Sequence, residues 1–165
     1  MSSIKRILFV CTGNSCRSVM AEGLMKSKLK ERGLKSIEVE SSGIAAPNGM
    51  GPTAETIQVM AEKKIDVSSH QSRLLTSEMI EKADLILVMG EVHREEILYK
   101  VPQAKEKVFL LKSYGTNVTN ESAEIPDPIG RPLESYEVCR NVIEEAVVRV
   151  IEKFMSPDHQ SPSHQ

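Results

Sequence analysis

The sequence lacks three features that would place it in other classes of protein. It has no long apolar run, because the longest, residues 85–89, is far too short to cross a membrane. It has no excess of positive charge, since 21 basic and 23 acidic residues leave a net charge of −2. We therefore expect neither nucleic acid nor an anionic membrane surface as a partner. Its three cysteines are not spaced as a disulfide framework or a zinc site.

The compartment and the organisation of the chain follow from what remains. The first residues lead directly into an apolar, strand-like segment without a signal-peptide core, so a reducing cytoplasm is the predicted location. The length of 165 residues fits one domain, and no internal repeat is present. We expect a single domain over residues 1–155. The polar, proline-containing segment 156–165 is predicted to be a disordered tail.

Apolar patterns along the chain predict strands and helices in alternation. Strands are expected at residues 4–10, 37–40, 84–89 and 107–111, and helices at 18–32, 53–64, from 76 onward, 92–99 and 133–154. Four strands separated by helices imply right-handed crossovers and an α/β fold, with a central four-stranded parallel sheet covered on both faces. In such sheets ligands bind beyond the C-terminal ends of the strands.

The segment directly after the first expected strand reads Cys-Thr-Gly-Asn-Ser-Cys-Arg-Ser, residues 11–18. A loop of small residues between a buried strand and a helix directs successive backbone N–H groups inward and so forms an anion cradle. Gly13 and Asn14 tolerate the left-handed backbone that such a loop needs. The spacing Cys-x5-Arg is weak evidence by itself, because it can arise by chance. Its place between a buried strand and a helix makes it strong evidence for a phosphate-binding loop. The predicted phosphate-binding loop contains Thr12, Gly13, Asn14, Ser15, Cys16 and Ser18.

The residue types in this loop indicate phosphoryl transfer to sulfur. The N–H donors and the positive end of the helix both favour the thiolate form of Cys11, the predicted nucleophile. Arg17 offers a planar fork that can hold two phosphate oxygens and stabilise the transition state. Ser18 can donate its hydroxyl to the sulfur. The loop lacks the Gly-Lys-Ser/Thr ending of nucleotide-binding loops, and we expect no metal and no cofactor.

A carboxylic acid is needed to protonate the leaving group. Asp127 lies between two prolines in the polar segment before the last expected helix. The prolines stiffen the backbone on both sides. We therefore predict that Asp127 is the general acid and then the base for the attacking water.

With these residues in hand, the sequence resembles the low-molecular-weight protein tyrosine phosphatase family over about residues 4–154. The resemblance rests on residues 11–18, on Met-Ala-Glu at 20–22, on Ser-Ser-Gly at 41–43 and on Asp-Pro at 127–128. It implies a flavodoxin-like three-layer sandwich, a phosphocysteine intermediate at Cys11 and phosphorylated proteins as substrates. It also implies that Asn14, Ser42 and His70 form a network that holds the loop in shape.

Several functions remain open within this resemblance. Tyrosine-specific members carry Ile at the position of Ser15 and aromatic residues after Asp-Pro, where this chain has Ile129 and Gly130, and the chain has no tryptophan. Bacterial protein arginine phosphatases carry a hydroxyl residue, Thr, at the position of Ser15. Thioredoxin-linked arsenate reductases often share this loop, but they need cysteines after the third strand, where residues 89–99 contain none. A non-catalytic phosphoprotein-binding module would tend to lack the nucleophile or the acid, and both are present.

Two further expectations concern assembly and regulation. The chain is expected to be a monomer or a weak dimer. Cys16 shares the loop with Cys11, so a Cys11–Cys16 disulfide could protect the nucleophile from overoxidation. The alternative is that Cys16 is a small apolar residue that packs under the loop.

Overall fold

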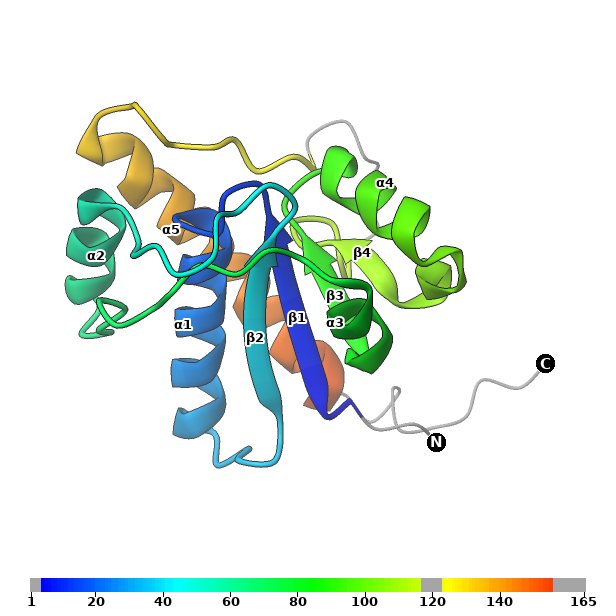
Figure 1. Cartoon of the computed structure of the whole chain (residues 1–165). Coiled ribbons are helices and arrows are strands. Elements are labelled where there is room, and N and C mark those ends of the chain that lie inside the picture. Colours follow the sequence, from blue (N-terminus) through cyan, green and yellow to red (C-terminus); the bar gives the residue numbers. More distant parts are fainter. Residues whose placement is uncertain (1–3, 117–122, 156–165) are drawn as a thin grey trace.

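The computed structural model describes residues 4–116 and 123–155. Its centre is a sheet of four parallel strands, β1 (Arg6–Cys11), β2 (Glu38–Gly43), β3 (Leu85–Val88) and β4 (Val108–Leu110), in the order β2-β1-β3-β4 (Figure 1). The predicted parallel sheet is therefore confirmed. The second strand is longer than expected at its C-terminal end, because residues 41–43 pair with residues 9–11 of β1.

Helices cover both faces of the sheet, as predicted (Figure 1). They are α1 (Arg17–Glu31), α2 (Ala54–Ala61), α3 (Ser77–Lys82), α4 (Glu91–Lys100) and α5 (Leu133–Met155). Successive side chains of a strand point to opposite faces, so β1 takes part in two cores. Ile7 and Phe9 pack with α1, α2 and α5, whereas Leu8 and Val10 pack with α3 and α4.

Two parts of the chain differ from the expected elements or fall outside them. A short 3-10 helix, η1 (Pro102–Lys107), precedes β4 where we predicted no element. Proline at its first position suits a helix start, but six mostly polar residues give no periodic signal. The expected disordered tail, residues 156–165, lies outside the described residues. No helix in the described ranges is both long and apolar enough to span a membrane.

The parallel arrangement decides where a site can form. All four strands run in the same direction, so their C-terminal ends lie along one edge of the sheet. Cys11, Gly43 and Val88 are the last residues of three adjacent strands. The segments that leave these ends are therefore close together.

Candidate active site

The loop between β1 and α1 is the structural centre of the candidate site. Cys11 ends the strand and Arg17 begins the helix, with no side chain capping the helix N-terminus. Asn14 takes the left-handed conformation with φ of 54°, whereas Gly13 does not. The loop packs directly against the end of β2, because a Cβ atom at Gly43 would collide with the Thr12 carbonyl oxygen and lie 2.9 Å from the Asn14 nitrogen. Glycine at position 43 therefore allows the loop to approach the sheet edge.

The Cys11 sulfur is the hydrogen-bond acceptor of this loop. It lies 2.9 Å from the Ser18 hydroxyl oxygen and 3.3 Å from the Asn14 backbone nitrogen. The Ser18 oxygen already accepts a bond of 2.8 Å from Asn14 Nδ2. Its own proton is therefore free to point at the sulfur. Two hydrogen-bond donors are therefore directed at one sulfur.

Asn14 holds the loop to two neighbouring segments. Its Oδ1 accepts from the Arg73 backbone nitrogen at 3.0 Å and contacts His70 Nε2 at 3.2 Å. Its Nδ2 donates to Ser18 and, at 3.0 Å, to the Ser41 hydroxyl. Both oxygen and nitrogen of the buried amide are therefore satisfied, and the left-handed turn at Asn14 is fixed from outside the loop.

The prediction that Ser42 belongs to this network is wrong. The hydroxyl that reaches Asn14 is that of Ser41, which also donates to Glu22 Oε1 at 2.5 Å. Ser42 is the next residue of β2, so its side chain points to the opposite face of the sheet. Its hydroxyl oxygen is buried and has no hydrogen-bond partner among the described residues.

His70 does lie in the network, close to Glu22. Its Nδ1 is 3.8 Å from Glu22 Oε1, in addition to the contact between Nε2 and Asn14. Burial lowers the pKa of His70, and the nearby Glu22 carboxylate opposes that shift. A lowered pKa favours the neutral ring near neutral pH, and a neutral ring with its proton on Nε2 donates to Asn14 Oδ1.

Arg17 joins the phosphate loop to the segment that contains Asp127. The buried guanidinium donates through Nη1 to the Ile125 carbonyl oxygen at 2.9 Å. Its Nη2 lies 3.6 Å from Asp127 Oδ2. The structure thus brings together Cys11, Arg17 and Asp127, which line one small pocket of about 130 Å³. The other residues lining this pocket are Thr12, Gly13, Ser15, Cys16 and Ile129.

Sequence analysis missed His93, a buried residue in the first turn of α4. Its Nε2 lies 2.9 Å from the Thr12 hydroxyl oxygen. Burial and, to a lesser degree, the positive charge of Arg17 lower the pKa of His93 to about 4, so the ring is neutral near pH 7. The available signal was its position shortly after the third strand, at the same sheet edge as the loop.

Cys16 faces the protein interior beneath the loop. Its sulfur lies 3.6 Å from Thr53 Oγ1 and 4.0 Å from the Tyr136 hydroxyl, which sequence analysis also missed. Burial is the main cause that raises the pKa of Tyr136 to about 12. Cys11, Cys16 and Cys139 are all free thiols. These contacts suit a packing role, and the protective disulfide stays a prediction.

The candidate site combines a thiol, a guanidinium and a carboxyl group. No group of three or more His, Cys, Asp or Glu side chains within residues 4–116 and 123–155 is placed to hold a metal ion. The arrangement can bind a tetrahedral anion and attack it with sulfur.

Comparison with known proteins decides the family. The family model for low molecular weight phosphotyrosine protein phosphatases matches residues 6–159. The chain belongs to this family. The predicted resemblance and the flavodoxin-like fold are thereby confirmed, and the chain is a protein phosphatase.

Three relatives of this phosphatase bear on its substrate. A protein-arginine-phosphatase from Bacillus subtilis is 39% identical over 153 residues, which cover 92% of this chain and 97% of the relative. A probable low molecular weight protein-tyrosine-phosphatase, EpsP, from Ralstonia solanacearum is 35% identical, with coverage of 87% and 92%. A solved YwlE arginine phosphatase mutant with a phosphorylated active-site serine superposes with a TM-score of 0.85 at 33% identity, and covers 94% of this chain and 99% of that one. Neither an arsenate reductase nor a binding module is favoured by these relatives.

Proposed function

We propose that this phosphatase removes phosphate from arginine side chains of proteins, with Cys11 as nucleophile, Arg17 as phosphate clamp and Asp127 as acid and base. One observation carries the proposal: Cys11, Arg17 and Asp127 line one small pocket, and the Cys11 sulfur faces two hydrogen-bond donors. A solved relative holds phosphate on its active-site residue, which supports a phosphoenzyme intermediate.

The proposed first step forms the sulfur–phosphorus bond. The phosphoryl group lies in the cradle of backbone N–H groups and is held by the Arg17 guanidinium. The Cys11 thiolate attacks phosphorus, and the bond from phosphorus to the leaving nitrogen breaks. Asp127, in its acid form, gives that nitrogen a proton. The products are the arginine guanidinium, which has received the Asp127 proton, and phosphocysteine.

The proposed second step regenerates the thiolate. The Asp127 carboxylate takes a proton from a water molecule, whose oxygen attacks phosphorus. The sulfur–phosphorus bond breaks, and the electron pair returns to Cys11. Ser18 and the Asn14 backbone nitrogen stabilise the leaving thiolate, as they stabilise the attacking one.

Phosphoarginine suits the walls of the pocket. Ser15 supplies a hydroxyl that can accept a hydrogen bond from a guanidinium N–H group. Among the residues that the structure describes, none that lines the pocket is aromatic, so these walls offer a phenyl ring no aromatic partner for stacking. Phosphotyrosine is the second candidate, because Ile129 offers apolar surface at the pocket, and its side chain is largely exposed.

The test compares phosphoarginine and phosphotyrosine peptides of the same sequence. We expect a higher kcat/KM for the phosphoarginine peptide. Ser15→Ile should raise the phosphotyrosine-to-phosphoarginine ratio of kcat/KM, because it removes a polar contact and adds apolar surface. Ser15→Thr is the matched control and should leave the ratio unchanged, since it keeps the hydroxyl. A ratio that Ser15→Ile does not alter would place selectivity elsewhere, with Ile129 as the next position to change.

We further propose that the phosphatase works in the cytoplasm, without a metal, as a monomer or weak dimer. The three free thiols support a reducing compartment. Activity should be unaffected by a chelator, and light scattering should report mostly single chains.

A further inference from the structure

The segment that contains Asp127 is attached to the sheet edge at its N-terminal end. We call residues 123–132 the acid loop. The backbone nitrogen of Ile125 donates to the Met89 carbonyl oxygen at 2.9 Å, and its carbonyl oxygen accepts from Arg17. Its side chain is buried. Ile125 is therefore held on three sides, two residues before Asp127.

Glu124 adds a side-chain attachment beside this backbone anchor. Its Oε2 accepts a hydrogen bond of 2.8 Å from the Glu91 backbone nitrogen, the first residue of α4. Gly90, at the N-cap position of α4, has no side chain that could do this. The acid loop thus supplies the cap of another element, and a carboxylate at a helix N-terminus is favourable.

Gly90 provides the space for that carboxylate. A Cβ atom at this position would collide with Glu124 Oε1. The backbone of Gly90 is extended, with φ of −166°, so any residue could adopt it. Glycine is therefore important at this position because it leaves space for the Glu124 carboxylate, and not because of its backbone conformation. An alanine would displace the flexible end of Glu124 without straining the helix start.

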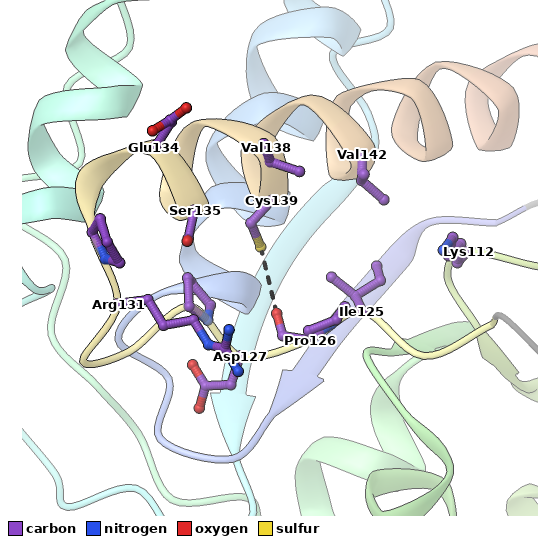
Figure 2. A pocket seen from close by; sticks show the side chains of 12 residues that line it. Lys112, Ile125, Pro126, Asp127, Arg131, Glu134, Ser135, Val138, Cys139 and Val142 are labelled. Atoms are coloured by element: carbon purple, nitrogen blue, oxygen red, sulfur yellow. Dashed lines mark hydrogen bonds between the residues drawn. The ribbon is translucent and has the colours of Figure 1, made fainter.

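The opposite side of the acid loop is only partly packed against α5. A cavity of about 500 Å³ lies between them, crossed by the contact of Cys139 Sγ with the Pro126 carbonyl oxygen at 4.0 Å, and Asp127 borders both this cavity and the catalytic pocket. Figure 2 shows Ile125, Pro126 and Asp127 along one wall, with Val138 and Cys139 of α5 along the other. The attachments at residues 124 and 125 therefore fix the N-terminal end of the acid loop, while Arg17 and Cys139 contact it further along the chain.

We propose that Glu124 is a positioning residue that, by capping α4, holds the acid loop so that Asp127 points into the catalytic pocket. The same turn of α4 carries His93, which contacts Thr12 of the phosphate loop. The first turn of α4 therefore contacts both the acid loop, through Glu124, and the phosphate loop, through Thr12. The inference rests on the proposed role of Asp127 as general acid.

The test uses the dependence of the first step, formation of phosphocysteine, on the leaving group, measured by burst kinetics because Asp127 is also the proposed base of the second step. Two substrates are compared: the phosphopeptide that the wild type cleaves faster, and an activated aryl phosphate that needs no proton. Glu124→Ala should lower the first-step rate for the phosphopeptide by roughly three- to tenfold, a part of what general acid catalysis contributes, and leave that rate for the aryl phosphate nearly unchanged. Glu124→Gln keeps an oxygen acceptor for Glu91 and should recover most of the rate.

Gly90→Ala tests the same contact from the other side. It should reproduce the selective loss seen in Glu124→Ala, and the double variant should be no worse than either single one. Thr76→Ala is the matched control, because it removes the side-chain cap of α3, away from the residues that line the pocket. It should change stability without altering the ratio of the two rates.

Asp127→Ala, measured in parallel, separates the two hypotheses. If Asp127→Ala shows no selective loss on the phosphopeptide, both the acid assignment and this inference fail. In a second outcome, Asp127→Ala slows the phosphopeptide selectively while Glu124→Ala and Gly90→Ala slow both substrates equally or slow neither substrate. In that case Glu124 does not position the acid. Additive losses in the double variant would equally overturn the proposal.

Discussion

Arg17 Nη2 lies 3.6 Å from Asp127 Oδ2, so the first residue of α1 contacts the acid loop near the opposite end of the chain. The same guanidinium bonds the Ile125 carbonyl oxygen. Arg17 is therefore placed to do two things: to hold a bound phosphate and to keep the acid loop against the phosphate loop. A substitution of Arg17 should therefore affect both phosphate binding and the position of the acid loop.

Cys11→Ser should abolish turnover but keep phosphate binding, because the backbone donors of the loop remain. Arg17→Ala should lose both, since the clamp and the link to the acid loop disappear together. Phosphate binding can be followed by calorimetry and turnover by phosphate release. Substantial activity from Cys11→Ser would contradict the assignment of the nucleophile.

Asp127→Ala should slow phosphopeptide cleavage by about 10²–10⁴-fold, the usual contribution of general acid catalysis. Cleavage of an activated aryl phosphate should suffer far less at the first step, because its leaving group needs no proton. Burst kinetics separate that step from hydrolysis of the phosphocysteine. Equal losses in the first step on both substrates would indicate a structural role for Asp127.

Ser41→Ala and Ser42→Ala form a matched pair of adjacent residues on opposite faces of β2. Ser41→Ala removes one of the two hydrogen bonds donated by Asn14 Nδ2 and the hydroxyl donor to Glu22 Oε1, and should cost about 1–3 kcal/mol of unfolding free energy and reduce kcat/KM. Ser42→Ala removes a hydroxyl that has no partner among the described residues, so it should be neutral or stabilising. Denaturant unfolding and steady-state kinetics measure both effects. If Ser42→Ala proved the more damaging, the network described here would be incorrect.

His93 should make the protein less stable in mild acid. Its pKa in the folded state is lowered to about 4, chiefly by burial and then by Arg17, with Glu124 and Asp127 acting in the opposite direction. In the unfolded chain the pKa of this side chain is near 6.5, so below that pH the unfolded state binds a proton that the folded state does not. The free energy of unfolding is therefore highest above pH 6.5 and decreases as the pH falls toward 4. The decrease in the free energy of unfolding should approach about 3 kcal/mol.

His93→Gln isolates this effect, because glutamine can still bond Thr12 but does not titrate. The difference in unfolding free energy between wild type and variant should therefore decrease between pH 6.5 and pH 4, or change sign in favour of the variant. Denaturant unfolding at several pH values provides the measurement. Parallel curves for the two proteins would show that His93 does not titrate in this range.

The sequence by itself determined the parts of this protein that depend on neighbours along the chain. Alternating apolar segments predicted the parallel sheet, since strand and helix periodicities are local properties. The phosphate loop could be recognised because Cys11, Asn14, Arg17 and Ser18 lie within eight residues, between a strand end and a helix start. Asp127 could be singled out because the prolines on both sides restrict its backbone.

Only the tertiary structure decided which distant residues complete the site. Ser41 and Ser42 are identical in type, and the register of β2 against β1 determines which of them faces Asn14. His93 and Glu124 become relevant only because the strand ends meet at one edge of the sheet, where α4 and the acid loop leave it. Such contacts depend on how whole elements pack, and no short stretch of sequence contains that information.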